Sequence, residues 1–472
     1  MSTNRSIRLL YVFILIGLAN IFFSSCSQET LNGKIIITRT AAKLENINLV
    51  SGDSWQYIPK TQIAVIDSVN GAESVKIITE DFFSAQSPSI SYDGSHMLFA
   101  AQRKENDHWQ IWEMDLGNFK VRQMTFSDQN CTDPDYLPNG TFVFSKLNAD
   151  DSLKAGHSLY TSKPDGSDIK RITFNPETYF ASNVLKDGRI LTIGRQVFPK
   201  NGEQELTIML PDGTKADLFY KGIQGSFLLT KGREYSDGKI LFIESATGKK
   251  GGGNLVSINY NRPLHTRNDL TPGLDGDFRS VAPGFGGKLL VSFRNSDSEK
   301  YSIYEFDPKN KALGKKVYGD KDFEVIDAFV VEAKQRPKKL PSEVNLESKT
   351  ALLLCQDINF GNRSDSFSGK KASKVEILGL NSSLGIVQAE EDGSIYLKIV
   401  ADQPFQIQTL DDEGNVVNGP CNWIWLRPNE RRGCIGCHED QELVPENKVP
   451  MAVKKPPIII GVQSDNFKNK NY

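Results

Sequence analysis

The chain has 472 residues, of which 39% are hydrophobic and 24% are charged, and it contains 38 glycines and 6 cysteines. This apolar content is sufficient for a folded core, so intrinsic disorder is excluded as the main state. Six cysteines in a chain of this length do not make a disulfide framework. Lysine and arginine total 56 against 58 acidic residues. No strongly basic surface is expected, and nucleic acid is not an expected partner.

The N-terminus has the pattern of a bacterial export signal. Two arginines precede an apolar run of 15 residues from Leu9 to Phe23, and two serines follow it. A membrane span needs about 20 residues, so residues 1–25 are predicted to be a cleaved signal peptide. Small residues directly before Cys26 resemble the lipobox of bacterial lipoproteins. We therefore expect a lipid on Cys26, attachment to a membrane through it, and a periplasmic or surface-exposed place in the cell envelope. An ordinary signal peptide whose cleavage leaves a cysteine is the alternative.

Turn glycines followed by apolar, strand-like segments recur along the first two thirds of the chain. They are Gly33, Gly94, Gly140, Gly188, Gly238 and Gly287, and from Gly94 on their spacings are 46, 48, 50 and 49 residues. A near-constant period of this size indicates a propeller or a solenoid. Strands of period two alternate with Asp-Gly and Asn-Gly turns inside each unit, which predicts antiparallel four-stranded blades.

Two of these units carry a recognisable sequence pattern. Ser89-Ile-Ser-Tyr-Asp-Gly94 and Tyr136-Leu-Pro-Asn-Gly140 resemble the repeats of TolB-type β-propellers. The resemblance spans about residues 34–335 and implies an all-β ring of six blades, with seven as the alternative, closed by the region after Tyr318. Closure hides most sheet edges. Propellers host enzymes and binding platforms alike, so this fold does not select a function.

A second domain is predicted after the repeats. Residues 336–348 are charged and contain prolines, which is typical of a linker. Five short strand-like segments follow and indicate a compact antiparallel β domain of about 100 residues. These segments are Ala351–Cys355, Lys374–Leu378, Ile386–Ala389, Ser394–Ile399 and Phe405–Leu410. The predicted organisation is a signal peptide at 1–25, a propeller at 26–335, the linker, a β domain at 349–460 and a tail at 461–472.

The sequence Cys434-Ile-Gly-Cys437-His438 is the attachment signature of c-type haem. Both thiols add to haem vinyl groups, and the histidine is placed to bind the iron from the proximal side. A redox disulfide and half of a zinc site are the alternatives, because Cys-x-x-Cys serves both. Export favours haem, and the sequence has no second Cys-x-x-Cys and no thioredoxin-like pattern around the motif. We therefore expect one covalent haem c per chain.

The region around the motif resembles the hydrazine synthase alpha subunit family. The similarity is carried by Val387-Gln-Ala-Glu-Glu-Asp-Gly393 and by Trp425-x-x-Pro-x-Glu-x-Arg-x-Cys-x-x-Cys-His438, and it is strongest over residues 386–442. The resemblance implies that the β domain corresponds to the family's middle, haem-bearing domain. It also implies thioether bonds at Cys434 and Cys437, with His438 as the motif histidine.

Departures from that family bear on the expected activity. In the synthase a tyrosine shortly after the motif binds the catalytic haem, whereas here Glu439-Asp-Gln-Glu442 follows and the next tyrosine is Tyr472. The synthase also has a further domain with a second haem, and the sequence given runs 34 residues beyond His438. We therefore expect a simpler redox or electron-transfer role, with His438 as the proximal ligand. Catalysis as a haem-dependent oxidoreductase stays open.

Other candidate residues have two interpretations each. Met451 is a weak candidate for the distal iron ligand, and the alternative is a tail methionine without contacts. Trp423, Trp425 and Phe405 either line the haem or fill the β core. Three arginines either pair with haem propionates or are solvated charges: Arg427, Arg431 and Arg432. Four histidines are expected in core or surface roles rather than as metal ligands: His96, His108, His157 and His265. Among the remaining cysteines a disulfide is favoured between Cys355 and Cys421, with Cys131 left over.

Two functions follow from these observations. The first is a lipid-anchored, single-haem c-type cytochrome whose propeller supplies a docking surface for a redox protein or covers the haem. The second is a non-catalytic binding module of the cell envelope, in which the propeller holds a peptide or a glycan. In that case Cys434 and Cys437 form only a disulfide.

Overall fold

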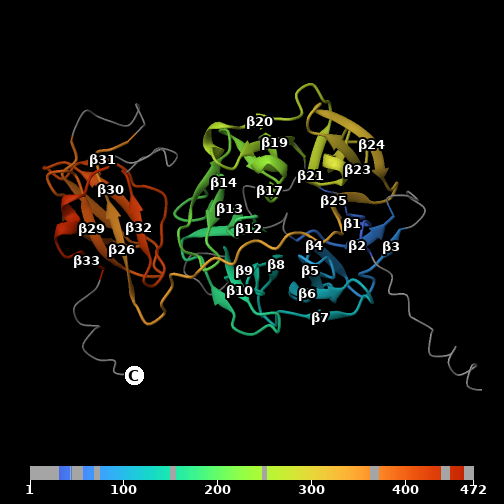
Figure 1. The fold of residues 1–472 in the computed structure, drawn as a ribbon, viewed down its shortest axis with the longest axis horizontal. Coiled ribbons are helices and arrows are strands. Elements are labelled where there is room, and N and C mark those ends of the chain that lie inside the picture. Colours follow the sequence, from blue (N-terminus) through green and yellow to red (C-terminus); the bar gives the residue numbers. More distant parts are fainter. Residues whose placement is uncertain are drawn as a thin grey trace, which may run out of the picture.

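The predicted repeat folds into antiparallel sheets that stand around one axis as six blades (Figure 1). The computed structural model describes residues 31–42, 44, 57–67, 75–148, 156–246, 252–361, 371–436 and 447–461. In these ranges the chain consists of strands, turns and short 3-10 helices. No helix in the described ranges is long and apolar enough to cross a membrane.

The blades follow the order of the chain. Blade 1 contains β1 (Ile35–Thr40), β2 (Thr61–Ile66), β3 (Lys76–Ile77) and β25 (Glu324–Val330). Blade 2 contains β4 (Ser84–Ile90), β5 (His96–Gln102), β6 (Gln110–Asp115) and β7 (Val121–Gln123). Blade 3 contains β8 (Cys131–Tyr136), β9 (Phe142–Leu147), β10 (His157–Ser162) and β11 (Lys170–Arg171). Blade 4 contains β12 (Glu177–Val184), β13 (Ile190–Gln196), β14 (Gln204–Met209) and β15 (Asp217–Lys221). Blade 5 contains β16 (Ser226–Leu228), β17 (Arg233–Glu234), β18 (Lys239–Ala246), β19 (Asn254–Asn259) and β20 (Asn268–Asp269). Blade 6 contains β21 (Asp277–Pro283), β22 (Leu289–Arg294), β23 (Ser302–Asp307) and β24 (Ala312–Tyr318).

The ring closes because the last propeller strand pairs with the first. β25 runs antiparallel to β1, with Val330 opposite Ile35. Blade 1 thus takes its innermost strand from the end of the repeat array and its other strands from the start. The prediction that the region after Tyr318 closes the ring is confirmed, and the described residues form six blades rather than seven.

The six repeat glycines share one backbone conformation. Their φ angles lie between +67° and +91°, in the left-handed region that glycine adopts without steric strain. Each of them precedes the second strand of its blade. At Gly188 the lack of a side chain also matters, because a Cβ there would lie 2.5 Å from Lys338 O. The sequence period therefore reports a turn that every blade requires.

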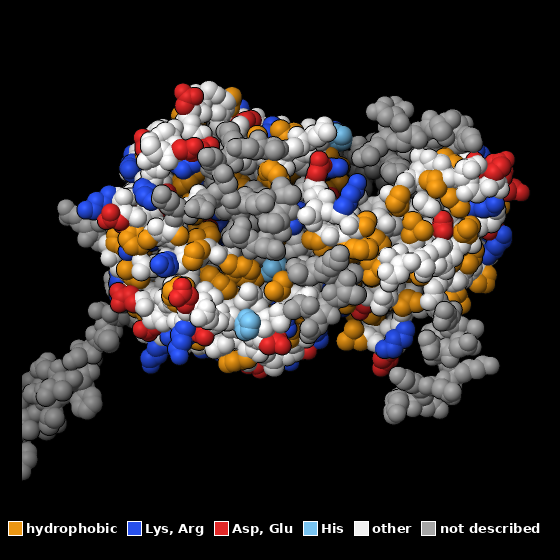
Figure 2. Space-filling view, turned by 180° about the vertical axis from the view of Figure 1, so that it is seen from behind, with side chains coloured by type: hydrophobic (Ala, Val, Ile, Leu, Met, Phe, Trp, Pro, Cys, Tyr) orange, Lys and Arg blue, Asp and Glu red, His pale blue; other side chains and the backbone are white. Residues whose placement is uncertain are grey.

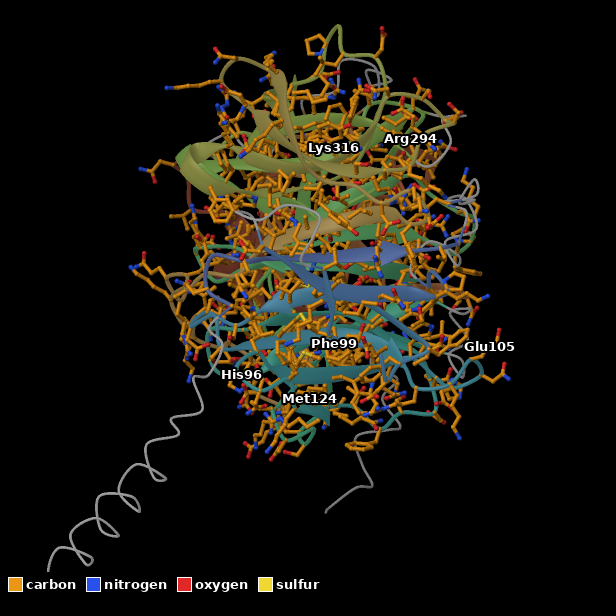
Figure 3. The ribbon with its side chains drawn as sticks, turned by 90° about the vertical axis from the view of Figure 1, so that its right-hand side faces the viewer. His96, Phe99, Glu105, Met124, Arg294 and Lys316 are labelled. Atoms are coloured by element: carbon orange, nitrogen blue, oxygen red, sulfur yellow. The ribbon has the colours of Figure 1, made fainter. Side chains whose placement is uncertain are left out.

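Apolar side chains between adjacent strands and blades form the propeller core. Phe99 on β5 is fully buried and contacts Phe82 edge to face, with ring centroids 5.3 Å apart. Figure 3 shows Phe99 among the strands, with His96 and Glu105 at opposite sides of the propeller. Fully burying one side chain of this size contributes about 1.5–3 kcal/mol.

The inner strands bulge at the propeller axis. The register of β4, β8 and β12 against the next strand of the blade shifts around Ser87, Asp133 and Ala181. These three residues have φ angles of +55°, +50° and +55°. A bulge interrupts pairing and re-aims a side chain. As a result, Ser87, Asp133 and Ala181 all line one small cavity on the axis.

A carboxylate at one of these bulges links three blades. Asp133 accepts a hydrogen bond from Ser87 Oγ of blade 2 at 2.7 Å and another from Ala181 N of blade 4 at 3.0 Å. Asp135 makes the same two kinds of bond to the same two blades. These carboxylates thus satisfy backbone N–H groups of the first strand of blade 4.

Beyond the propeller, residues 350–460 form a β-sandwich of two four-stranded sheets. Their inner faces share a core that includes Leu353, Val375, Leu397 and Phe405. The first sheet is ordered β32 (Arg431–Cys434), β26 (Thr350–Cys355), β29 (Ile395–Val400) and β33 (Ile458–Ile460). The second is ordered β28 (Ser383–Gln388), β27 (Lys374–Leu378), β30 (Gln406–Leu410) and β31 (Val416–Asn418).

The sequence predicted an antiparallel β domain, but the sandwich also contains two parallel strand pairs. β32 pairs parallel with β26, and β33 pairs parallel with β29. A parallel neighbour requires a long return of the chain, and both strands lie well after the five predicted segments. They are short and lack a clear alternating pattern, so the sequence did not indicate them.

The segment between the domains lies along one face of the propeller (Figure 1). It contains no strand from residue 331 to 349. Lys334 N donates to Tyr92 O at 2.7 Å, and Glu343 pairs with Lys215 Nζ at 2.7 Å. The linker is therefore bound to the propeller along its length. Figure 2 shows the sandwich as a separate lobe beside the propeller, with hydrophobic side chains on its surface.

Replacing the inter-blade carboxylate tests its contribution to stability. Asp133→Ala leaves the buried Ala181 N–H without an acceptor, so we expect the free energy of unfolding in urea to fall by about 2–4 kcal/mol. Asp133→Asn retains an acceptor and should cost clearly less. Asp165→Ala, at an exposed turn where the carboxylate accepts hydrogen bonds from Ser167, is the control. A loss no larger than that of the control contradicts the role of Asp133.

Candidate functional site

Cys434, the first cysteine of the haem motif, ends strand β32. β32 lies parallel to β26, with Cys434 opposite Cys355. The strand therefore fixes the position of the first motif residue on the sandwich. Cys437 and His438 lie outside the described residues, as does the predicted lipidation site Cys26.

Cys434 lies on the wall of a cavity of about 610 Å³. Both sheets of the sandwich contribute to its apolar wall, with Leu353 and Ile395 from one sheet and Ile407 from the other, and Ile424 adds to it from outside the sheets. Propeller residues 215–217, from the turn before β15 and its start, complete another side. The cavity is thus formed by both domains, which sequence reasoning missed because no local pattern connects a blade turn to the motif.

Two further cysteines line this cavity, Cys355 and Cys421. Cys421 Sγ accepts a hydrogen bond from Ile407 N at 3.1 Å, and burial raises the pKa of its thiol to about 11. Cys421 has no disulfide, so the favoured Cys355–Cys421 bond is wrong. The Cys421 thiol is engaged by the backbone of β30 instead. Cys131 is also a free thiol, buried in blade 3.

Met451 lies in a short helix that does not belong to the described cavity wall. It begins the 3-10 helix η5 (Met451–Lys454), and its backbone N–H donates to Asp392 Oδ2 at 2.8 Å. Met451 is not among the described residues that line the cavity. Its role as a distal ligand stays a prediction without support from this arrangement.

The domains are joined by a docking segment, residues 423–432, that precedes the motif. Glu430 in this segment is fully buried. Its carboxylate accepts hydrogen bonds from Lys215 N of the propeller at 2.9 Å and from Arg427 N at 2.8 Å. It also pairs with the Arg432 guanidinium at 2.7 Å, while Arg432 Nη1 donates to Ala216 O of the propeller at 3.1 Å.

Arg427 forms a second link between the domains. It donates to Arg171 O at 3.0 Å, lies over the ring of Phe174 at 4.6 Å, and pairs with Asp402 at 3.4 Å. Arg427 and Arg432 both donate to propeller carbonyls, so neither is the solvated charge of the second interpretation. Arg431 is exposed, and Arg431 and Arg432 both line the cavity.

The two tryptophans of the docking segment also contact the propeller. Trp425 is 2% exposed and lies edge to face with Tyr179 of blade 4, at 6.2 Å between centroids. Trp423 Nε1 donates to Phe198 O at 3.1 Å. Phe405 is buried in the sandwich core. All three are structural, and the two tryptophans pack between domains rather than within the β domain.

The four propeller histidines belong to no group of three potential metal ligands in the described part of the chain. Among the described residues no cluster of three His, Cys, Asp or Glu side chains could hold a metal ion. His157 is buried beside Tyr57, and burial lowers the pKa of its imidazole to about 4. Its expected core role agrees with this position.

Blade 4 contains two neighbouring acidic side chains, the buried Glu177 and the half-buried Glu205. Glu177 accepts a hydrogen bond from Tyr179 Oη at 2.8 Å, and a Cβ on Gly194 would lie 3.1 Å from Glu177 Oε2. Glu205 is opposite Gly194 on the next strand, so the two carboxyl groups approach across that glycine. Burial raises the pKa of Glu177 to about 7, and burial together with Glu177 raises that of Glu205 to about 8.

This pair predicts a pH dependence of stability. Both carboxyl groups keep their protons to higher pH in the folded than in the unfolded chain, so folding takes up protons between about pH 5 and 8. The free energy of unfolding should fall as pH rises through this window, by about 1.4 kcal/mol per pH unit for each proton. The double substitution Glu177→Gln with Glu205→Gln should flatten the slope, and Glu203→Gln at the surface should not. Equal slopes in all three proteins refute the assignment.

The docking segment can be tested by removing its carboxylate. Glu430→Ala leaves the Arg432 charge unpaired in the interface, and we expect the free energy of unfolding to fall by about 3–5 kcal/mol. Limited proteolysis should then cut near residues 333–348 more rapidly. Glu347→Ala, on the exposed part of the linker, is the matched control. If both variants unfold and digest alike, Glu430 does not hold the domains together.

Comparisons with known proteins agree with this architecture. Residues 321–439 match the family model described as the hydrazine synthase alpha subunit middle domain. The chain is 23% identical over 521 aligned residues to hydrazine synthase subunit alpha of Kuenenia stuttgartiensis, and the alignment covers 82% of this chain. It covers 64% of that subunit, so this chain spans less than two thirds of the length of this relative.

A solved structure gives the same relation at the level of the fold. Hydrazine synthase from Kuenenia stuttgartiensis superposes with a TM-score of 0.77 at 20% identity, covering 90% of this chain and 71% of that one. TolB from Acinetobacter baumannii gives a TM-score of 0.38 at 16% identity, covering 63% of this chain and 67% of that one. The resemblance expected from sequence is thereby confirmed: the chain is similar to the hydrazine synthase alpha subunit, and residues 321–439 carry the match to that subunit's middle domain.

Proposed function

We propose that this protein is an exported, lipid-anchored c-type haem protein of the bacterial cell envelope that works in redox chemistry or electron transfer. The observation that carries the proposal is the position of Cys434 on the wall of a cavity of about 610 Å³ between the propeller and the sandwich. Pockets for cofactors typically have volumes of about 300–1,000 Å³ and mainly apolar walls.

The residues around this cavity fit a covalent haem. Leu353, Ile395 and Ile407 supply apolar surface of the kind that a porphyrin ring needs. Arg431 and Arg432 lie at the same cavity and supply positive charge for the two propionates. The thiol of Cys434 is already at the wall, so the thioether bond requires no rearrangement of β32.

Each predicted residue has a definite part in holding this group. Cys434 and Cys437 would form the two thioether bonds, and His438 would be the proximal iron ligand. A haem in this site supplies one-electron redox chemistry. The apolar walls limit access of water, and burial of this kind is one of the protein's means of setting a haem potential.

The cellular setting is proposed from the N-terminus. Lipidation at Cys26 would hold the protein to a membrane, on the periplasmic side or at the cell surface, where covalent haem attachment and an oxidising environment are available. The propeller then offers a docking surface for a redox protein partner. We propose electron transfer rather than hydrazine synthesis because the tyrosine that follows the motif in the synthase has no counterpart here.

Substituting the second motif cysteine tests haem attachment. After expression with the cytochrome c maturation machinery, the wild type should stain for covalent haem and show an α-band at about 550 nm. Cys437→Ser should lose covalent attachment at that position, and Cys131→Ala, in the propeller, should retain it. A colourless wild type in which Cys434 and Cys437 form a disulfide would establish the alternative, a binding module without a redox group.

A further inference from the structure

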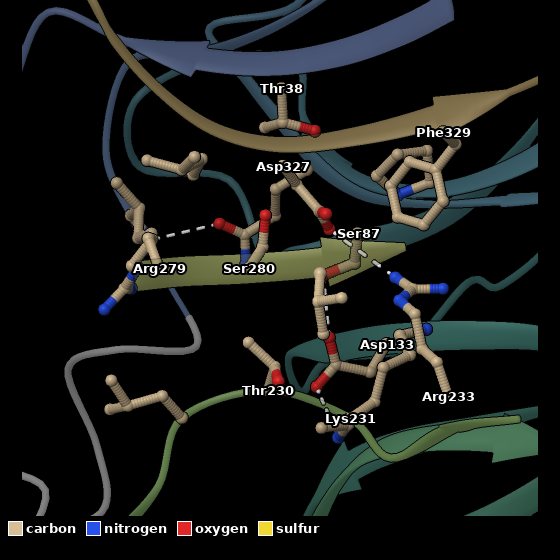
Figure 4. Close-up of a pocket in the computed structure, with 17 residues that line it drawn as sticks. Thr38, Ser87, Asp133, Thr230, Lys231, Arg233, Arg279, Ser280, Asp327 and Phe329 are labelled. Carbon is tan, nitrogen blue, oxygen red and sulfur yellow. Dashed lines mark hydrogen bonds and ion pairs between the residues drawn. The ribbon is translucent and has the colours of Figure 1, made fainter. Parts of the chain in front are cut away.

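The acidic side chains of the propeller are not all neutralised in the same way. On the axis, Asp327 Oδ2 lies 3.6 Å from Arg233 Nη2, and further cationic side chains line the same cavity (Figure 4). Glu177 and Glu205 of blade 4 lie outside the wall of that cavity. In the described part of the chain no lysine or arginine forms an ion pair with either of them. Once ionised, these two carboxyl groups lack a counter-ion.

One face of the blade 4 sheet brings the two carboxyl groups together. Gly194 on β13 lies opposite Tyr179 on β12 and opposite Glu205 on β14. Residues directly opposite each other on antiparallel strands point to the same face, and so do residues two apart along one strand. Glu177, Gly194, Glu205 and Thr207 therefore share this face. Because Gly194 has no side chain, it leaves a space between the other three.

Oxygen atoms converge on the space that Gly194 leaves open. A Cβ at this position would lie 2.9 Å from Thr207 Oγ1 and 3.1 Å from Glu177 Oε2. Glu205 is directly opposite Gly194, so its carboxyl group borders the same space. A hydroxyl oxygen and two carboxyl groups therefore lie around one point on this face, and the local charge is negative when the carboxyl groups ionise.

Two of these three groups have no partner. Thr207 is 5% exposed, and its Oγ1 has no hydrogen-bond partner among the described residues. Glu205 is half-buried, and no described residue donates a hydrogen bond to its carboxyl group. Lys221, opposite Glu205 on β15, pairs with Glu203 at 3.6 Å instead. Buried polar groups are normally paired, so an unpaired buried oxygen beside two carboxyl groups points to a bound species of positive charge.

The carboxyl group of Glu177 is held in place by a chain of hydrogen bonds. Asn175 Nδ2 donates to Tyr179 Oη at 2.8 Å, and Tyr179 Oη donates to Glu177 Oε2 at 2.8 Å. These donors are uncharged, so they position the carboxylate without neutralising it. A carboxylate oxygen has two lone pairs. Glu177 Oε2 is therefore able to accept the bond from Tyr179 and to bind an ion at the same time.

We propose that blade 4 binds a hard divalent cation, calcium or magnesium, in the space beside Gly194. Glu177 and Glu205 supply two carboxylates that balance its charge, and Thr207 Oγ1 supplies a neutral oxygen. Both cations prefer oxygen ligands, and magnesium in particular keeps several waters when the protein offers only one or two carboxylates. Glu205 is half-buried, so water reaches the site and completes the shell. This site is independent of the proposed haem.

Binding can be measured on the full chain after removal of metal with EDTA, at about pH 8.5, where both carboxyl groups can lose their protons. Calcium chloride and magnesium chloride are each compared with sodium chloride at equal ionic strength. We expect at least one of the two cations to give a saturable rise in Tm and a saturable heat in calorimetry. Glu205→Gln should raise its Kd at least about ten-fold, because a charged ligand is lost. Glu105→Gln, at the surface of blade 2, should leave the Kd unchanged.

Two further variants decide the outcome if Glu205→Gln does not fold. Gly194→Ala retains both carboxyl groups and places a methyl group in the proposed site, so we expect the Kd to rise at least about ten-fold. Thr207→Val removes only the hydroxyl and should raise the Kd about three- to ten-fold. The proposal is overturned if the wild type shows no saturable response beyond sodium chloride with either cation. It is equally overturned if the folded variants at positions 194, 205 and 207 bind like the wild type, which would place binding elsewhere.

Discussion

The arrangement of the two domains depends on one buried carboxylate. Glu430 has no exposed surface, and it accepts hydrogen bonds from the propeller backbone at Lys215, from its own segment at Arg427 and from the Arg432 guanidinium. A buried charge of this kind is tolerated only when its oxygens are satisfied together. The geometry that satisfies Glu430 is therefore a particular placement of the sandwich against blade 4, and the interface is specified as well as stabilised.

The same carboxylate connects the interface to the haem motif. Strand β32 begins immediately after Glu430 and ends at Cys434. Arg432, within this strand, binds both Glu430 and Ala216 O, so the propeller contacts the strand that carries the first motif cysteine. Residues 215–217 also form one side of the cavity. A shift of the domains would open that side and displace Cys434, which explains why the proposed cofactor site needs both domains.

The features that the sequence predicted are those with a repeated or local signal. The blade period followed from glycines that every hairpin requires, and the five strands of the sandwich from their alternating apolar residues. Long-range contacts left no such signal. Trp425 and Arg427 have the composition of core or surface residues, and only the fold shows that they meet blades 3 and 4. An acid surrounded by arginines, as Glu430 is by Arg427, Arg431 and Arg432, is the one hint of the interface that was present. The disulfide prediction failed because a shared domain, and even a shared cavity wall, does not bring two thiols within bonding distance.

The central claim is that a haem occupies the cavity between the propeller and the sandwich. A crystal structure of the chain after cytochrome c maturation tests it most directly. The account predicts porphyrin density in that cavity, joined to Cys434 and Cys437 and in van der Waals contact with Leu353 and Ile407. Density for a Cys434–Cys437 disulfide with only water in the cavity, or a haem bound away from these walls, would contradict it.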